Sequence, residues 1–338
     1  MTLSYAVIGT GAIGGYYGGR LAQAGCDVHF LLRSDYEQVQ ENGLVVDSVK
    51  GDFALPNVQA YRRASEMPPV DIALVCLKTT QNEQIADLLP PIKPEGAILL
   101  LQNGLNVESA VARHLQARHL QVRHLQARHL QERQKQVPTI FGGLCFICSS
   151  KIGPGHISHT DYGRLLLGMH DSQSKVKDPS ALLKEIAVDF EKANIPTKLT
   201  SDLPMARWLK LVWNVPYNGL SVVLDATTEE MMKDDEIRQL IKDLMREVVG
   251  VADAWGAKNS VGAERKLGEN AIAQMFDQTE NMPSYLTSMK LDFDNRRPLE
   301  IEAILGAPLR VAESMQVAMP ATRMLYQQLV FLDRRNRG

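Results

Sequence analysis

A polar stripe within an apolar stretch is the first feature of this sequence with chemical potential. Lys210, Asn214 and Asn218 are spaced four residues apart in the run 208–218, so on a helix they share one face. Burying an ammonium among apolar neighbours is costly, so a lysine in such a stretch indicates a specific role. It can donate a proton to an oxygen that gains charge, while the amides orient a substrate. The alternative is a surface lysine whose charge reaches water.

A glycine-rich turn near the N-terminus has the pattern G-x-G-x-x-G. It follows a short apolar run and precedes a helical one, which is the context that a dinucleotide-binding motif requires. In such a motif the three glycines permit a tight turn, close approach of the pyrophosphate, and packing of helix on strand. The free N–H groups of the helix then stabilise the phosphates. The predicted cofactor-binding residues are Gly9, Thr10, Gly11, Ala12, Ile13 and Gly14; a glycine turn that binds nothing is the alternative.

The residue that ends the second predicted strand selects between cofactors. An acidic residue there accepts from the ribose of NAD, whereas a cation suits the 2′-phosphate of NADP. This chain has Arg33 at that place, and a guanidinium fork matches a phosphate. We therefore predict NADP(H), although Asp35 lies close by in the sequence and a plain surface arginine is the alternative.

Further polar residues follow two apolar runs, 71–77 and 97–101. Lys78 and Asn103 come directly after the predicted strands, and ligands of an open α/β sheet bind beyond the carboxyl ends of its strands. Both side chains are predicted to face the cofactor. Ser288 and Glu300 prove little by themselves, since a capping serine and a solvated glutamate are the ordinary explanation.

The elements that must position these residues fall into two groups. Predicted strands at 4–8, 26–32, 71–77 and 97–101 alternate with helical stretches, which favours βαβ units and a parallel sheet. Residues 140–167 resemble a hairpin, and 180–194 form an amphipathic helix. From 205 to 333 the pattern is helical throughout. The predicted fold class is α/β, with a Rossmann domain at 1–170 and a helical domain at 200–338.

Composition excludes several classes of protein. The chain has 338 residues and a formal net charge of −2, so no global charge favours nucleic acid or an anionic membrane. No apolar run reaches the ~18 residues that span a bilayer. Its cysteines, Cys26, Cys76, Cys145 and Cys148, lie in apolar surroundings. We expect a soluble cytoplasmic protein with buried thiols and no metal site; a redox or metal role for the Cys145–Cys148 pair is the alternative.

One segment, 113–131, is of low complexity. It repeats the five-residue unit Arg-His-Leu-Gln followed by Ala, Val or Glu. Five residues turn a helix by about 140° net, so the histidines spiral around it and share no face. The segment is predicted to be a solvated helical insertion without a consistent apolar face; a metal site and an anion-binding stripe are the alternatives.

Taken together, these motifs resemble those of the ketopantoate reductase (2-dehydropantoate 2-reductase) family. The resemblance covers nearly the whole chain apart from the repeat. It rests on the Gly9–Gly14 turn, Arg33, Leu77-Lys78, Gln102-Asn103-Gly104, Lys210-x-x-x-Asn214-x-x-x-Asn218, Thr287-Ser288-Met289 and Glu300-Ile-Glu302. It implies NADPH-dependent reduction of 2-dehydropantoate to pantoate in pantothenate biosynthesis. It also implies an all-helical second domain like that of 6-phosphogluconate dehydrogenase.

The resemblance also implies a role for each site residue. Lys210 matches the catalytic lysine and general acid, and Glu300 a glutamate near the nicotinamide and active site. Asn103, Lys210, Asn214, Asn218 and Ser288 are the implied substrate-binding residues, while Arg33, Lys78, Asn103, Cys148 and Glu300 are implied cofactor contacts.

Two other functions stay open at this point. Departures from the family pattern around Leu299, Leu305 and Lys290 surround the implied substrate site, so another branched 2-oxo acid is an alternative substrate. A non-catalytic NADP(H)-binding regulator is the alternative of another class. The expected partner is a small 2-oxo acid, with neither nucleic acid nor membrane, and a homodimer is left open.

Overall fold

The computed structural model describes residues 2–125, 138–170, 176–259 and 265–338. The chain divides into two compact units. The first comprises residues 1–102 and 107–203, and the second comprises residues 103–106 and 204–338. The short segment Asn103–Asn106 therefore belongs to the second unit, although the chain on both sides of it belongs to the first.

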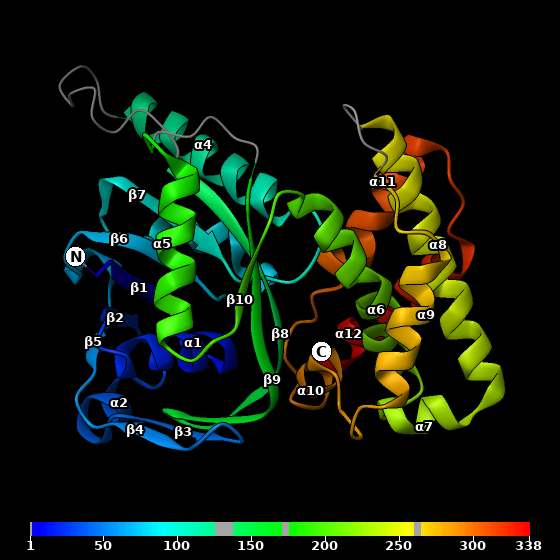
Figure 1. The fold of residues 1–338 in the computed structure, drawn as a ribbon, viewed down its shortest axis with the longest axis horizontal. Helices are drawn as coiled ribbons and strands as arrows, with labels where there is room; N and C mark the ends of the chain where they lie inside the picture. Colours follow the sequence, from blue (N-terminus) through cyan, green and yellow to red (C-terminus); the bar gives the residue numbers. More distant parts are fainter. Residues whose placement is uncertain (1, 126–137, 171–175, 260–264) are drawn as a thin grey trace. The chain divides into compact units, whose positions relative to one another are not determined.

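The first unit is built on one mixed sheet (Figure 1). The order of its main path is β4-β3-β9-β8-β7-β6-β1-β2-β5, and β10 pairs with β9. Neighbours from β5 through β8 are parallel, whereas β9 runs antiparallel to β8. The strands of the described residues are β1 (Ser4–Ile8), β2 (Asp27–Leu31), β3 (Leu44–Ser48), β4 (Phe53–Leu55), β5 (Gln59–Tyr61), β6 (Val70–Val75), β7 (Ile92–Leu100), β8 (Thr139–Gly153), β9 (His156–Met169) and β10 (Thr197–Thr200).

Both faces of the parallel part of the sheet are covered. Along β1, Tyr5 and Val7 enter one apolar core while Ala6 and Ile8 enter another, as side chains alternating along a strand must. The first core includes side chains of α1 and α5, and the second includes side chains of α3 and α4. The helices of this unit are α1 (Ala12–Gln23), α2 (Tyr36–Asn42), α3 (Ile85–Leu88), α4 (Val107–Leu125) and α5 (Pro179–Lys192), with 3₁₀ turns at Ala64–Glu66 and Thr79–Gln84.

All regular elements among the described residues of the second unit are helical (Figure 1). Its elements are α6 (Leu203–Val223), α7 (Thr228–Lys233), α8 (Asp235–Lys258), α9 (Gly268–Glu280), α10 (Ser288–Asp294), a π-helical turn (Glu302–Gly306), α11 (Ala307–Met315) and α12 (Pro320–Arg337). One apolar core joins side chains of α6, α8, α9 and α12. Buried Trp208 and Tyr217 of α6 lie in it, so α6 is a central helix of the unit.

The predicted α/β fold class is confirmed, including the helical second half. The strands of 4–8 and the hairpin of 140–167 are present as β1 and as β8–β9. Between the predicted strands 71–77 and 97–101, where a helical stretch is expected, the chain forms only a 3₁₀ turn and the single turn α3. The amphipathic helix expected at 180–194 is present as α5, with Leu183 and Ile186 on its buried face and Val188 50% exposed.

The prediction for the repeat needs one correction. Its first units form part of α4, and Leu115 is buried with Val111 in the core beneath that helix. Arg118 forms an ion pair with Asp87 at 2.6 Å. The repeat therefore does present an apolar residue at its start, while residues 126–131 lie outside the described part of the chain.

Two further sequence expectations concern thiols and membranes. Cys145 and Cys148 are buried, and all four cysteines are free thiols. None of the described helices is both long and apolar enough to cross a bilayer.

Candidate functional site

The glycine-rich turn joins β1 to α1, and the surroundings of its three glycines differ. Gly9 has φ +97°, a conformation that glycine adopts without steric cost. A Cβ on Gly14 would collide with the carbonyl oxygen of Gly9 and lie 2.8 Å from Val7 Cγ1. A Cβ on Gly11 would meet nothing within 4 Å. Protein atoms therefore leave no room for a side chain at Gly9 or Gly14, whereas the space beside Gly11 is open.

The open side of the turn is also the amino end of α1. Gly11 is the N-cap and supplies no side-chain hydrogen bond to the first turn, so the leading N–H groups of the helix are available to an anion. Thr10 Oγ1 donates to the carbonyl of Leu31 at 3.1 Å, which ties the turn to the end of β2. Ala12 and Ile13 form the first turn of α1 and are half-buried. These features fit a dinucleotide phosphate.

Arg33 lies just beyond β2, exposed and without an ion pair to any described residue. Asp35, the nearby acid, is buried and bound elsewhere: Lys151 Nζ lies 2.5 Å from Oδ2, and the amide of Gly155 donates to it at 3.0 Å. Burial alone would raise the pKa of Asp35, but hydrogen bonds from Lys151, Gly155 and Ser34 outweigh it and lower this pKa below its ordinary value. Asp35 therefore stays ionised and is neutralised by Lys151, so it does not pair with Arg33.

The ends of β6 and β7 are joined by a buried amide. Gln102 Nε2 donates to the carbonyl of Leu77 at 2.8 Å and to Asn82 Oδ1 at 2.7 Å. Leu77 precedes Lys78, which is half-buried. Lys78 lies beyond the carboxyl end of β6 and precedes the 3₁₀ turn Thr79–Gln84.

In the second unit, the structure brings Lys210 and Asn103 together. Lys210 Nζ donates to Asn103 Oδ1 at 2.8 Å. Lys210 is only half-buried, whereas Asn214 and Asn218 on the same helix are 5% and 2% exposed. The polar stripe of α6 thus lies on an inner face of the helix. This burial argues against the alternative interpretation, in which Lys210 is a surface lysine whose charge reaches water.

The remaining substrate-binding candidates lie near the buried end of this stripe. Ser221 Oγ bonds the carbonyl of Asn218 at 3.0 Å and the hydroxyl of Thr287 at 2.7 Å. Thr287 caps α10, whose first residue is half-buried Ser288. Ser288 is therefore linked to Asn218 through two buried hydroxyl groups.

Glu300 is 5% exposed, so its carboxylate is not the solvated group that its sequence context favoured. Its carbonyl accepts from the amide of Ile304 at 3.1 Å, which places it at the start of the stretch that continues into the π-helical turn. Cys148, in the first unit, is buried on β8.

Sequence reasoning missed the residues that hold Asn103 in place. The Asn103 segment, defined as Asn103–Asn106, is anchored by Arg207 Nη1, which donates to the carbonyl of Gly104 at 3.2 Å. The amide of Leu105 donates to the carbonyl of Ala303 at 2.9 Å. The signal available in the sequence was an arginine in an apolar run, three residues before Lys210, since arginine is seldom buried without partners.

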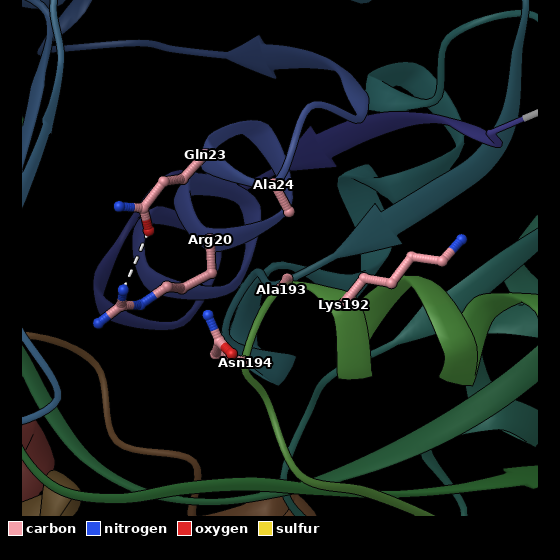
Figure 2. A pocket seen from close by; sticks show the side chains of 6 residues that line it. All are labelled: Arg20, Gln23, Ala24, Lys192, Ala193 and Asn194. Carbon is pink, nitrogen blue, oxygen red and sulfur yellow. Dashed lines mark hydrogen bonds between the residues drawn. The ribbon is translucent and has the colours of Figure 1, made fainter.

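A separate hollow of about 290 Å³ lies elsewhere in the first unit (Figure 2). It is lined by Arg20 and Gln23 at the carboxyl end of α1 and by Lys192 and Asn194 at the end of α5. The glycine turn is at the opposite end of α1, so this hollow does not belong to the dinucleotide motif. Within the described residues, no group of three or more His, Cys, Asp or Glu side chains is arranged to hold a metal.

Two family models match this chain. The model described as "Ketopantoate reductase PanE/ApbA" matches residues 5–172, and "Ketopantoate reductase PanE/ApbA C terminal" matches residues 202–332.

Individual proteins resemble the chain over its whole length. A 2-dehydropantoate 2-reductase of Nostoc sp. is 47% identical, with 98% of this chain and 96% of the relative covered. The crystal structure of a 2-dehydropantoate 2-reductase from Geobacter metallireducens superposes with a TM-score of 0.83 at 37% identity, covering 97% and 99% of the two chains. A D-mandelate dehydrogenase in complex with NADH has a TM-score of 0.80 at 21% identity and covers 99% and 100%; this likeness concerns the fold alone.

Proposed function

Because this chain belongs to the ketopantoate reductase PanE/ApbA family, we propose that it reduces the C2 ketone of 2-dehydropantoate to pantoate, a step of pantothenate biosynthesis. The observation that carries the proposal is the 47% identity to the Nostoc enzyme over 98% of the chain. The Lys210–Asn103 pair supports it with chemistry that the reaction needs.

The first unit is proposed to bind NADP(H), which supplies the hydride when bound. The uncapped amides of α1 and the space above Gly11 receive the pyrophosphate, as in other motifs of this kind. Arg33 binds the 2′-phosphate, since its guanidinium has no other ionic partner among the described residues and a bidentate contact suits that group. Lys78 and Cys148 of this unit are proposed as further contacts to the cofactor, and so is Asn103, which belongs to the second unit.

The second unit is proposed to hold the keto acid and to supply the proton. Lys210 ammonium stabilises the negative charge that develops on the carbonyl oxygen and then protonates it. Asn103 accepts a hydrogen bond from Lys210 at 2.8 Å and so fixes where the ammonium points. Asn214, Asn218 and Ser288 bind the hydroxyl and carboxylate groups of the substrate, and Glu300 orients Lys210 and the ligand.

An assay of NADPH oxidation with a panel of 2-oxo acids tests the proposal. We expect 2-dehydropantoate to give the highest kcat/KM, with unbranched 2-oxo acids far behind. A higher kcat/KM for another branched 2-oxo acid would replace the substrate but keep the reaction. NADPH binding with no turnover on any member of the panel would favour a regulator. A cytoplasmic location and a homodimer remain predictions of the same proposal.

A further inference from the structure

Arg207 and the carbonyl of Ala303, neither of which belongs to a motif named above, hold the Asn103 segment within the helical unit. We propose that Arg207 and the π-helical turn position the side chain of Asn103 for its hydrogen bond with Lys210. Arg207 is then a positioning residue, which acts on the reaction through the backbone of Gly104. This inference rests on the proposed function, in which Lys210 donates the proton.

The π-helical turn releases a carbonyl that an α-helix would use internally. At the end of the turn the amide of Ala307 bonds the carbonyl of Glu302, five residues back, instead of that of Ala303. The next residue, Pro308, has no N–H to offer. The carbonyl of Ala303 is therefore free to accept from the amide of Leu105 at 2.9 Å. Single π-helical turns within α-helices are frequent at functional sites.

Gly104 permits the close approach that this hydrogen bond requires. Its φ is +104°, and a Cβ there would lie 2.5 Å from Ala303 Cβ and 2.7 Å from the Ala303 carbonyl oxygen. Any other residue would have to push the segment away from the turn. The carbonyl oxygen of Gly104 accepts a hydrogen bond from another group, Arg207 Nη1, at 3.2 Å.

Arg207 and Lys210 are three residues apart on α6, so they lie on neighbouring positions of one helix face. Arg207 is 3% exposed. One helix thus holds both the backbone of the segment, through Arg207, and its side chain, through Lys210. Loss of the backbone contact lets Asn103 drift from the ammonium, and a misplacement of about 1 Å can cost as much as ~10²-fold in rate.

The first test compares Arg207→Met with Arg207→Lys. We expect kcat to fall by about tenfold or more in the methionine variant while the KM for the keto acid changes little, since the lost orientation matters most in the transition state. The lysine variant, which keeps a cation, should recover part of kcat. Arg310→Met is the matched control, because Arg310 bonds the side chain of Glu302 in the same turn but is exposed.

A double-mutant cycle distinguishes positioning from general support of the fold. If Arg207 acts through Asn103, the effect of Arg207→Met on kcat should largely disappear in an Asn103→Ala background. Additive effects of the two substitutions, or unchanged kcat in Arg207→Met, would overturn the proposal.

A third readout does not depend on turnover. Hydrogen exchange of the peptide that contains residues 103–106 should accelerate in Arg207→Met and in Gly104→Ala. It should not accelerate in Gly250→Ala, where an added Cβ meets nothing within 4 Å. If the wild type failed to reduce 2-dehydropantoate, the proposed function would fall, while accelerated exchange would still support the anchoring by Arg207. Unchanged exchange in both test variants would overturn the anchoring itself.

Discussion

Lys210 is the residue on which the proposed chemistry depends. Replacement by alanine removes the proton donor and the charge, so kcat should fall by roughly 10²–10⁴-fold, the range for general acid catalysis. The affinity for NADPH should change little, because the Gly9–Gly14 turn and Arg33 belong to the other compact unit. Steady-state kinetics and NADPH fluorescence titration measure the two quantities. Lys258→Ala, at the exposed end of α8, is the control, and near-normal kcat in Lys210→Ala would disprove the mechanism.

Arg33 determines the expected preference between cofactors. Hydrogen bonds to a charged group contribute about 1.5–3 kcal/mol, so Arg33→Ala should raise the KM for NADPH by roughly 10- to 100-fold and leave the KM for NADH unchanged. Arg63→Ala is a matched control, because that guanidinium already pairs with Glu66 at 2.5 Å. If the wild type used NADH and NADPH equally well, Arg33 would have no role in selection.

Helix α4 contains the first units of the repeat, and we expect its buried leucine to contribute to stability while the later units do not. Leu115→Ala removes a side chain that is 5% exposed and should cost roughly 2–5 kcal/mol of unfolding free energy, as for other buried leucines. Deletion of the five residues 123–127 leaves Leu115 and Arg118 in place, so stability and kcat should stay close to those of the wild type. Urea unfolding and the reductase assay measure both. A deletion that destabilised the protein as much as Leu115→Ala would show that the later units also contribute to the core.

At the scale of the whole molecule, a buried histidine should make stability depend on pH. His159 is 2% exposed, with Nδ1 2.8 Å from Ser48 Oγ and Nε2 3.0 Å from the carbonyl oxygen of Asp161. Burial lowers the pKa of His159 in the folded state below its ordinary value near 6.5. Between these two pKa values the unfolded chain binds more protons, so stability is lost as the pH falls below about 6.5.

Thermal unfolding at several pH values tests this dependence. From pH 7 to about pH 5.5 the wild type should lose up to ~1 kcal/mol, or a few degrees in Tm. His159→Gln, which cannot titrate, should show a shallower slope even if its Tm is lower throughout. Parallel slopes would mean that His159 stays neutral in both states or is charged in both. Carboxyl groups with lowered pKa, such as Asp35 and Asp71, affect a more acidic range.

Local patterns of residues predict the features that depend on neighbours within a few residues. The glycine turn follows from the steric freedom of glycine, β1 from an apolar run bounded by that turn, and the stripe of Lys210, Asn214 and Asn218 from helical periodicity. These patterns sufficed for the fold class and, together with the order of the motifs, for the family.

Which distant groups meet depends on how the helices and strands pack. Asn103 and Lys210 are 107 residues apart in the chain, and no periodicity links a loop after a strand to a helix so far away. Asp35 looked like a competitor of Arg33 until Lys151 was found beside it. The π-helical turn leaves the carbonyl of Ala303 to accept from the distant amide of Leu105. In each case the deciding contact is a long-range pairing of polar groups, which a local pattern does not encode because burial and partners are set by how the elements pack.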